Sequence, residues 1–202
     1  MWTRHRPIAL LGTLMVVLSG ACGPSKWRPP LELAPDFQAT RIDPIVVLPA
    51  VDARIDTSIA VELATQLGED ALPILRARGY PAALGAAGPS AQGLGVDALA
   101  VADAATIRGL GPPGARWVMV LALVDVTTSM GLGSSGNAEL AGFLFDTQAG
   151  RLIWRDRGLG QVGQGGLLGF TLVAVMDEEA ISAALKHLLA SLPIQIPVSG
   201  AA

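Results

Sequence analysis

The stretch RWVMVLALVDV, residues 116–126, decides the fold of this 202-residue chain. Every side chain from Trp117 to Val124 is apolar. A strand with one wet face alternates apolar and polar residues, whereas a strand buried on both faces is a continuous apolar run. The stretch therefore predicts a central β-strand with other elements packed on both of its faces.

Two further strands are predicted directly downstream. The turn GLGSSG (131–136) leads into NAELAGFLFD (137–146), and the turn TQAG (147–150) leads into RLIWRDR (151–157). Short turns of this kind join neighbouring antiparallel strands, so the three segments predict a meander. A glycine-rich link then leads to a final helix, expected over residues 168–192, with an apolar stripe that includes Ile181, Leu185 and Leu188.

The upstream half predicts strands that alternate with helices. PIVVLPA (44–50) has the pattern of a short buried strand, and a helix is expected from Asp56 or Thr57 to about residue 78, kinked or restarted at Pro73. YPAAL (80–84) is a candidate second strand.

Residues 85–95 are expected to form a loop, and a second helix is expected over 96–108. The fold class is therefore α/β (α+β): a mixed sheet with an antiparallel three-strand meander and about three packed helices. We expect one domain over residues 44–192 and a loose tail over 193–202.

The first 21 residues have the pattern of a secretory signal peptide. Arg4 and Arg6 precede the apolar run PIALLGTLMVVL (7–18), and small residues follow at 19–21. The apolar run is shorter than the roughly 20 residues that span a bilayer. A buried core helix is the alternative, and the order of charged, apolar and small residues disfavours it.

The single cysteine, Cys22, closes this region in the sequence LSGAC. LSGAC resembles the bacterial lipobox, in which the cysteine becomes the first mature residue and carries lipid. The resemblance implies a diacylglyceryl thioether and an acylated amine on Cys22, and several acyl chains together anchor a protein stably. A free thiol or an intermolecular disulfide is the alternative. The residue after the cysteine is Gly23 and not an aspartate. Under the common sorting rule for bacterial lipoproteins, this favours the outer membrane.

Residues 22–43 are predicted to be a tether. Four prolines and the lack of any helical or strand period are typical of extended polyproline II chain. Such a tether lets the domain stand away from the membrane, or folds back along its side. The net charge of −3 becomes more negative once Arg4 and Arg6 are removed, which argues against nucleic acid as a partner.

No motif in the chain predicts catalysis or a cofactor. G-x-G-x-x-G occurs at 109–114, 131–136 and 158–163, but none of these lies in a strand–turn–helix–strand unit. G-x-S-x-G and H-E-x-x-H are absent. We therefore expect no catalytic residues, no metal and no cofactor, and we expect that the protein is not an enzyme.

Three sets of polar residues are nonetheless candidates for chemistry. His187 is expected to face solvent on the last helix, and the acids 177–179 point in diverging directions around that helix. Asp125, near the end of the central strand, is the acid that could line a pocket, although a strand-end hydrogen bond explains it more simply.

The segment GQGGLLGFTLVAVM, residues 163–176, is richer in small and apolar residues than a solvent link needs. It belongs either to the core or to an interface. The candidate interface residues are Gly165, Gly166, Leu167, Leu168 and Phe170, and self-association is the simplest form of contact.

The order of segments resembles a family of bacterial lipoproteins whose domain is like the amino-terminal domain of TolB. More distant kin are the curli-secretion lipoprotein and the lipoprotein activators of penicillin-binding proteins. The matching segments are IVVLPAVD, LPILRARGYPA, GARWVMVLALVDV, FDTQAGRLIW and GGLLG, within residues 45–169. Asp146, Gly150, Leu152 and Trp154 form the D-x-x-x-G-x-L-x-W part of the match. The chain departs from the pattern in its short Ala-Gly-rich middle, GAAGPSAQGLG, and in its lone Tyr80.

The resemblance implies a role in envelope assembly, secretion or regulation through protein contacts. With the lipobox-like cysteine and Gly23, we expect the protein at the outer membrane, facing the periplasm. It implies no catalytic residue. The alternative is a lipoprotein that binds a small molecule or a glycan.

The anchor can be tested directly. Replacing Cys22 with Ser removes the sulfur that would carry lipid, so we expect an unprocessed, unlipidated precursor. Membrane fractionation and mass spectrometry of the mature N-terminus would measure this. A lipid-modified mature protein from the Cys22→Ser variant would contradict the assignment.

Overall fold

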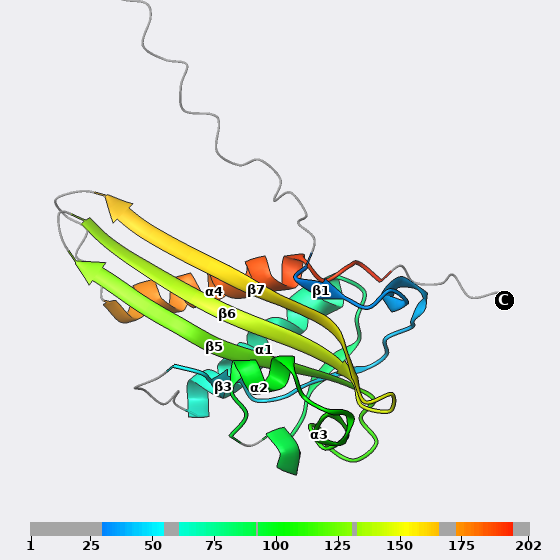
Figure 1. The fold of residues 1–202 in the computed structure, drawn as a ribbon. Helices are drawn as coiled ribbons and strands as arrows, with labels where there is room; N and C mark the ends of the chain where they lie inside the picture. Colours follow the sequence, from blue (N-terminus) through cyan, green and yellow to red (C-terminus); the bar gives the residue numbers. More distant parts are fainter. Residues whose placement is uncertain (1–29, 55–60, 92, 131–132, 166–172, 196–202) are drawn as a thin grey trace, which may run out of the picture.

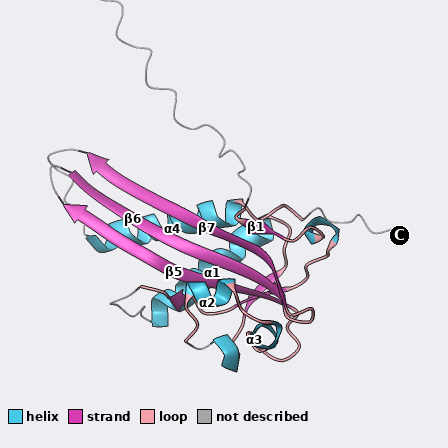
Figure 2. Ribbon diagram, in the orientation of Figure 1, coloured by secondary structure: helices cyan, strands magenta, loops and turns pink. Residues whose placement is uncertain are grey.

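A computed structural model describes residues 30–54, 61–91, 93–130, 133–165 and 173–195. The strands are β1 Glu32–Leu33, β2 Ile45–Val47, β3 Val51–Asp52, β4 Ala82–Leu84, β5 Trp117–Met130, β6 Gly133–Asp146 and β7 Arg151–Gly165. The helices are α1 Val61–Ala77, α2 Val96–Ala100, α3 Ala104–Arg108 and α4 Val173–Ala190, with 3₁₀ turns at Phe37–Ala39 and Pro89–Ala91. Figure 2 shows these elements by type.

The strands form one mixed sheet in the order β1-β7-β6-β5-β2-β4, with β3 also paired to β5. β2 and β3 run parallel to β5, whereas β5, β6 and β7 form an antiparallel meander. The predicted mixed α+β class, the meander and the central position of β5 are therefore confirmed.

Helices cover the two faces of the sheet unequally. α1 and α4 lie behind the long strands in Figure 1 and form the larger core with residues such as Leu67, Leu121 and Trp154. α2 and α3 cover the other face near Leu99, Ile107 and Phe143. β5, β6 and β7 continue beyond α2, and there the face opposite α4 is polar and exposed.

The region expected to be one helix over 96–108 is instead two short helices, α2 and α3. Asp103 separates them: its carboxylate accepts a hydrogen bond from the Thr106 N–H, which caps the start of α3. A side chain that caps a new helix competes with continuation of the previous one. α1, by contrast, is one helix that includes Pro73, so the helix does not restart there.

β7 is twice as long as predicted, because residues 158–165, expected to be a link, belong to the strand. A Cβ on Gly158 or Gly160 would overlap backbone atoms of α4, the Ala184 and Ala180 carbonyl oxygens respectively. Glycine at these alternate positions lets α4 lie directly against the strand. The glycine repeat is thus a packing surface rather than a connection.

Both ends of the domain differ from the expected bounds at residues 44 and 192. Phe37 and Ile42 are buried in the main core, although they lie in the predicted tether. At the other end, Gln195 Oε1 accepts a hydrogen bond from the Ile42 N–H at 3.1 Å, and the Arg78 guanidinium donates to the Leu192 carbonyl at 2.7 Å. Residues 193–195 are therefore held against the domain, and 196–202 lie outside the described residues.

The close packing of α4 on β7 predicts that substitution of one glycine of β7 destabilises the protein and substitution of another does not. Gly160→Ala should destabilise the protein by about 1–3 kcal/mol, because the new methyl group forces α4 away from the strand. Gly163→Ala is the matched control on the same strand, since a Cβ there meets nothing within 4 Å, and it should change stability by less than about 0.5 kcal/mol. Urea unfolding measures both, and equal effects would show that α4 does not lie as described.

Candidate functional site

The segment that follows the candidate anchor is bound to the edge of the sheet. β1 pairs antiparallel with β7, with Glu32 opposite Arg155 and Leu33 opposite Trp154, and the Ala34 N–H donates to the Ile153 carbonyl at 2.9 Å. Burial of Phe37 and Ile42 holds the rest of the segment. The point where this chain leaves the domain is therefore fixed by packing and main-chain pairing.

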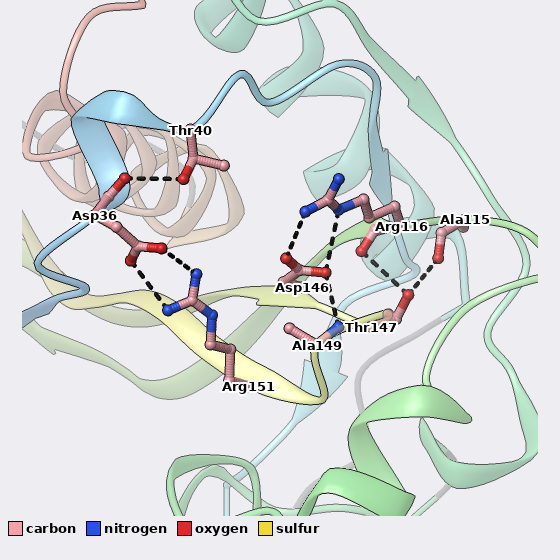
Figure 3. Close-up of polar contacts among 8 residues, drawn as sticks. All are labelled: Asp36, Thr40, Ala115, Arg116, Asp146, Thr147, Ala149 and Arg151. Carbon is pink, nitrogen blue, oxygen red and sulfur yellow. Dashed lines mark hydrogen bonds and ion pairs between the residues drawn. The ribbon is translucent and has the colours of Figure 1, made fainter.

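Two ion pairs join this segment to β7. The Arg151 guanidinium donates to both carboxylate oxygens of Asp36, at 3.0 and 2.5 Å. In the second pair, Arg155 Nη2 lies 3.1 Å from Glu32 Oε2. The hydrogen bond from Arg151 holds the pKa of Asp36 below its usual value. Exposed pairs of this kind contribute little stability. Figure 3 shows the pair between Asp36 and Arg151.

The hairpin between β6 and β7 supports this attachment. The buried Asp146 carboxylate accepts hydrogen bonds from Arg116 Nη2 at 3.0 Å and from the Ala149 N–H at 3.1 Å. Gly150 has φ 66°, a conformation that favours glycine. Thr147 Oγ1 donates to the Ala115 carbonyl at 2.6 Å, which joins the hairpin to the start of β5 (Figure 3). The D-x-x-x-G spacing thus forms a hydrogen-bonded turn, and Arg151, the next residue, pairs with Asp36.

The surroundings of Asp146 lower the pKa of its carboxyl group. Burial raises the pKa of Asp146, but the hydrogen bonds from Arg116 and from the Ala149 N–H, together with the charge on Arg116, outweigh burial and lower it overall. A carboxylate with a lowered pKa in the folded state stabilises that state above the pKa of the unfolded chain.

A groove of about 470 Å³ lies between α1 and α4. Its apolar lining includes Leu63, Leu67, Ile181 and Leu185, and its charged lining residues are all acidic, namely Asp70, Glu178 and Glu179. The three carboxylates project from two helices around an apolar floor. The groove is suited to contact with an apolar and basic surface.

A second hollow, of about 530 Å³, lies beyond the carboxyl ends of β2 and β3. Its charged lining residues are Asp52 and Arg54, which pair through two hydrogen bonds of 3.0 and 3.1 Å. The hydrogen bonds that Arg54 donates to the Asp52 carboxylate raise the pKa of Arg54. Ligands of open α/β sheets bind at the carboxyl ends of parallel strands, so the position suits a small ligand, although the described lining has no aromatic side chain.

Most of the residues predicted as sites lie outside the described residues. These are Cys22, Gly166, Leu167, Leu168 and Phe170, so their roles stay predictions. Gly165 is the last residue of β7. The structure does not bring the remaining candidates into one site.

Each of the polar candidates has an ordinary structural place. Asp125 is exposed at a bulge in β5. Asp177 accepts a hydrogen bond from Thr128 Oγ1, and His187 is exposed with Nδ1 2.6 Å from the Leu159 carbonyl oxygen. Over the part of the chain that the structure describes, no three His, Cys, Asp or Glu side chains are grouped to hold a metal ion, and no helix is long and apolar enough to cross a membrane.

Sequence reasoning missed the attachment of residues 32–42 and the long edge of β7. The signals were present but weak: Phe37 and Ile42 are single apolar residues among polar ones, and glycines 158 and 160 have a period of two. A period of two indicates a strand when the residues are apolar, and glycine hides that signal.

No family model matches the chain, and no curated protein matches it. Several solved bacterial structures resemble it. A PelC variant dodecamer from Paraburkholderia phytofirmans is 15% identical, with a TM-score of 0.45 over 82% of this chain and 96% of that one. Lipoprotein GNA1162 from Neisseria meningitidis is 19% identical, with a TM-score of 0.42 over 67% and 96%. XCC0632 from Xanthomonas campestris is 10% identical, with a TM-score of 0.42 over 81% and 90%. TM-scores below 0.5 at these identities assign neither a family nor a function.

The lowered pKa of Asp146 makes the stability of the folded protein depend on pH. Asp146→Asn should cost about 1–3 kcal/mol at pH 7, because the pairing of a buried charge with Arg116 is lost. The unfolded carboxyl has a pKa of about 3.9, and the stabilisation is lost as the pH falls below that value, through the lower pKa of the folded state. The difference between the two proteins should therefore shrink between pH 5 and pH 2 in denaturant titrations. Glu69→Gln, at an exposed position on α1, is the control, and an equal effect from it would contradict the assignment.

Proposed function

We propose that this chain is a lipid-anchored protein of the bacterial cell envelope, held at the outer membrane and facing the periplasm. It acts through protein contacts in envelope assembly, secretion or regulation, and it is not an enzyme. The observation that carries the proposal is the attachment of residues 32–42 to β7, directly downstream of a lipobox-like cysteine.

This attachment shortens the reach of the anchor. Only nine residues lie between Cys22 and Glu32, and at about 3.1 Å for each of the ten steps an extended polyproline II chain reaches about 30 Å. A domain held this close to a bilayer meets partners in or beside the membrane rather than partners across the periplasm. The fixed exit point of the chain also limits which faces of the domain can turn toward the membrane.

The described surfaces favour contact with other macromolecules. The acidic groove between α1 and α4 and the uncovered polar face of β5, β6 and β7 are broad features made of side chains that do not converge on one point. Catalysis needs groups placed around a reacting atom. The arrangement supports recognition of a surface better than it supports chemistry on a substrate.

The second candidate function is binding of a small molecule or glycan. The hollow beside Asp52 and Arg54 favours it, because its volume lies in the range of ligand pockets. The scarcity of polar side chains in its described lining makes it the weaker candidate.

Crosslinking in intact cells separates the two functions. A photoreactive amino acid at Gln66 reports on the groove, one at Thr127 reports on the uncovered sheet face, and one at Ala87 reports on the hollow. We expect discrete protein adducts from at least one of the first two positions, and we expect Cys22→Ser to abolish them because the domain is no longer held at the membrane.

The crosslinking experiment can also contradict the proposed contact function. If none of the three positions gives a protein adduct, and periplasmic sugars or peptides raise the melting temperature of the purified chain, the binding function replaces the contact function. Adducts that persist unchanged in Cys22→Ser would show that contact does not depend on the anchor.

A further inference from the structure

The chain that follows Cys22 enters the domain at one edge of the sheet. β1 is the edge strand beside β7, and β4 is the strand at the opposite edge (Figure 1). Residues 23–29 alone separate Cys22 from Pro30, the first described residue. At about 3.1 Å per residue, an extended polyproline II chain of this length reaches about 25 Å. A lipid on Cys22 therefore keeps the edge that carries β1 within about 25 Å of the bilayer.

Two large apolar side chains are exposed beside this point of entry. Leu31 directly precedes β1 and is 61% exposed, and Leu159, in the part of β7 that lies beyond the pairing with β1, is 63% exposed. Extension of the register between β1 and β7 places Leu31 opposite Asp156. That position is three residues from Leu159, or about 10 Å along the strand. The two leucines therefore lie at the same edge of the sheet, although they are far apart in the chain.

The charged side chains along this edge pair with one another. Arg155 Nη2 lies 3.1 Å from Glu32 Oε2, and Arg157 Nη1 lies 2.8 Å from Glu139 Oε1. A charge is costly to bring to an apolar layer unless it is paired. The pairing lets the edge approach such a layer without isolating a charge.

The end of α4 at this edge is basic, whereas its first half is acidic. His187 Nδ1 lies 2.6 Å from the Leu159 carbonyl oxygen, and both His187 and the preceding Lys186 are exposed. Glu178 and Glu179 instead line the groove between α1 and α4. Anionic headgroups attract cationic side chains and repel carboxylates. The charges of α4 therefore favour the β1 and β7 edge, rather than the groove, as the part that meets an anionic lipid surface.

We propose that the edge formed by β1 and the following part of β7 rests on the membrane that holds Cys22, with Leu31 and Leu159 in contact with lipid. Lys186 lies beside the headgroups in this orientation. The proposal rests on the lipid anchor of the proposed function. The sequence between the anchor and the edge has the same chemistry, because it includes KWR at 26–28, and tryptophan and basic residues are enriched at membrane interfaces.

A lipid surface fits this edge better than a protein partner does. A stable protein interface buries about 800 Å² on each partner around a continuous apolar core. Leu31 and Leu159 stand apart, and neither lines one of the two hollows described above. Separate apolar side chains can each enter the boundary between headgroups and acyl chains. Contact through this edge also leaves the acidic groove between α1 and α4 open to protein partners.

Site-specific labelling tests the orientation. In the full lipidated chain the sulfur of Cys22 is blocked, so Leu31→Cys, Leu159→Cys and Leu84→Cys each add one reactive thiol. Leu84 is the matched control, because it is an exposed leucine in β4, at the opposite edge of the sheet. Each thiol receives a nitrobenzoxadiazole dye, and the chain is placed in vesicles of phosphatidylethanolamine and phosphatidylglycerol. Circular dichroism checks that each labelled variant is folded like the parent chain.

Nitroxides on the lipid acyl chains should quench the dyes at positions 31 and 159 at least about twofold more than the dye at position 84. The reason is that only the first two enter the boundary layer, which is about 5–10 Å deep. Leu159→Asp should lower the quenching at position 31, because a carboxylate is repelled by the headgroups. Leu84→Asp should leave the quenching at position 31 unchanged.

Equal quenching at positions 31, 159 and 84 would overturn the proposal and leave the anchor intact. A dye at position 31 or 159 that is shielded from water but not quenched by lipid would also overturn it, because a second copy of the chain would then cover the edge. Reaction of the dye with the parent chain would show that Cys22 carries no lipid, and that result would overturn the anchor and the orientation together. The two failures are therefore distinguishable.

Discussion

The burial of β5 on both faces is the constraint on which the structure depends. Its side chains alternate between two cores: Met119, Leu121 and Leu123 face α1 and α4, whereas Val118 and Val120 face α2 and α3. A strand of this kind cannot lie at an edge, so it needs a neighbour on each side and a helical layer on each face. β2 and β6 supply the neighbours, and the order of the remaining elements follows from them.

The residues that were predicted well are those whose pattern has a single physical explanation. A continuous apolar run of eight residues indicates a central strand, and a turn of TQAG between apolar runs indicates a hairpin. The class of fold and the meander could therefore be predicted from sequence. The length of β7 could not, because glycine disfavours strands in general, and its benefit at 158 and 160 exists only in the presence of α4.

The candidate site was less predictable for a related reason. Phe37 and Ile42 are buried in the main core, and the partners that hold their segment, β7 and Gln195, lie more than a hundred positions away in the chain. Nothing local distinguishes the two residues from exposed residues in a proline-rich segment. Asp146, by contrast, lies in a turn signature that sequence alone can show, and its bond to the Ala149 N–H follows from that signature. The nearness of Leu31 to Leu159 depends on the pairing of β1 with β7, so it required the register of two strands far apart in the chain. The likeness to a TolB amino-terminal domain stays a prediction.

The hydrogen bond between the Ile42 N–H and Gln195 joins residues 153 positions apart. Arg78 and Tyr80 reinforce the same place, through the Leu192 and Pro193 carbonyls. Contacts of such long sequence separation form late, because the entropy of closing a long loop must be offset first. A ribosome makes residue 195 long after residue 42, so the Ile42 N–H gains its partner only 153 positions later in synthesis. The N-terminal end of the domain therefore completes its hydrogen bonding only after the C-terminal segment has been made.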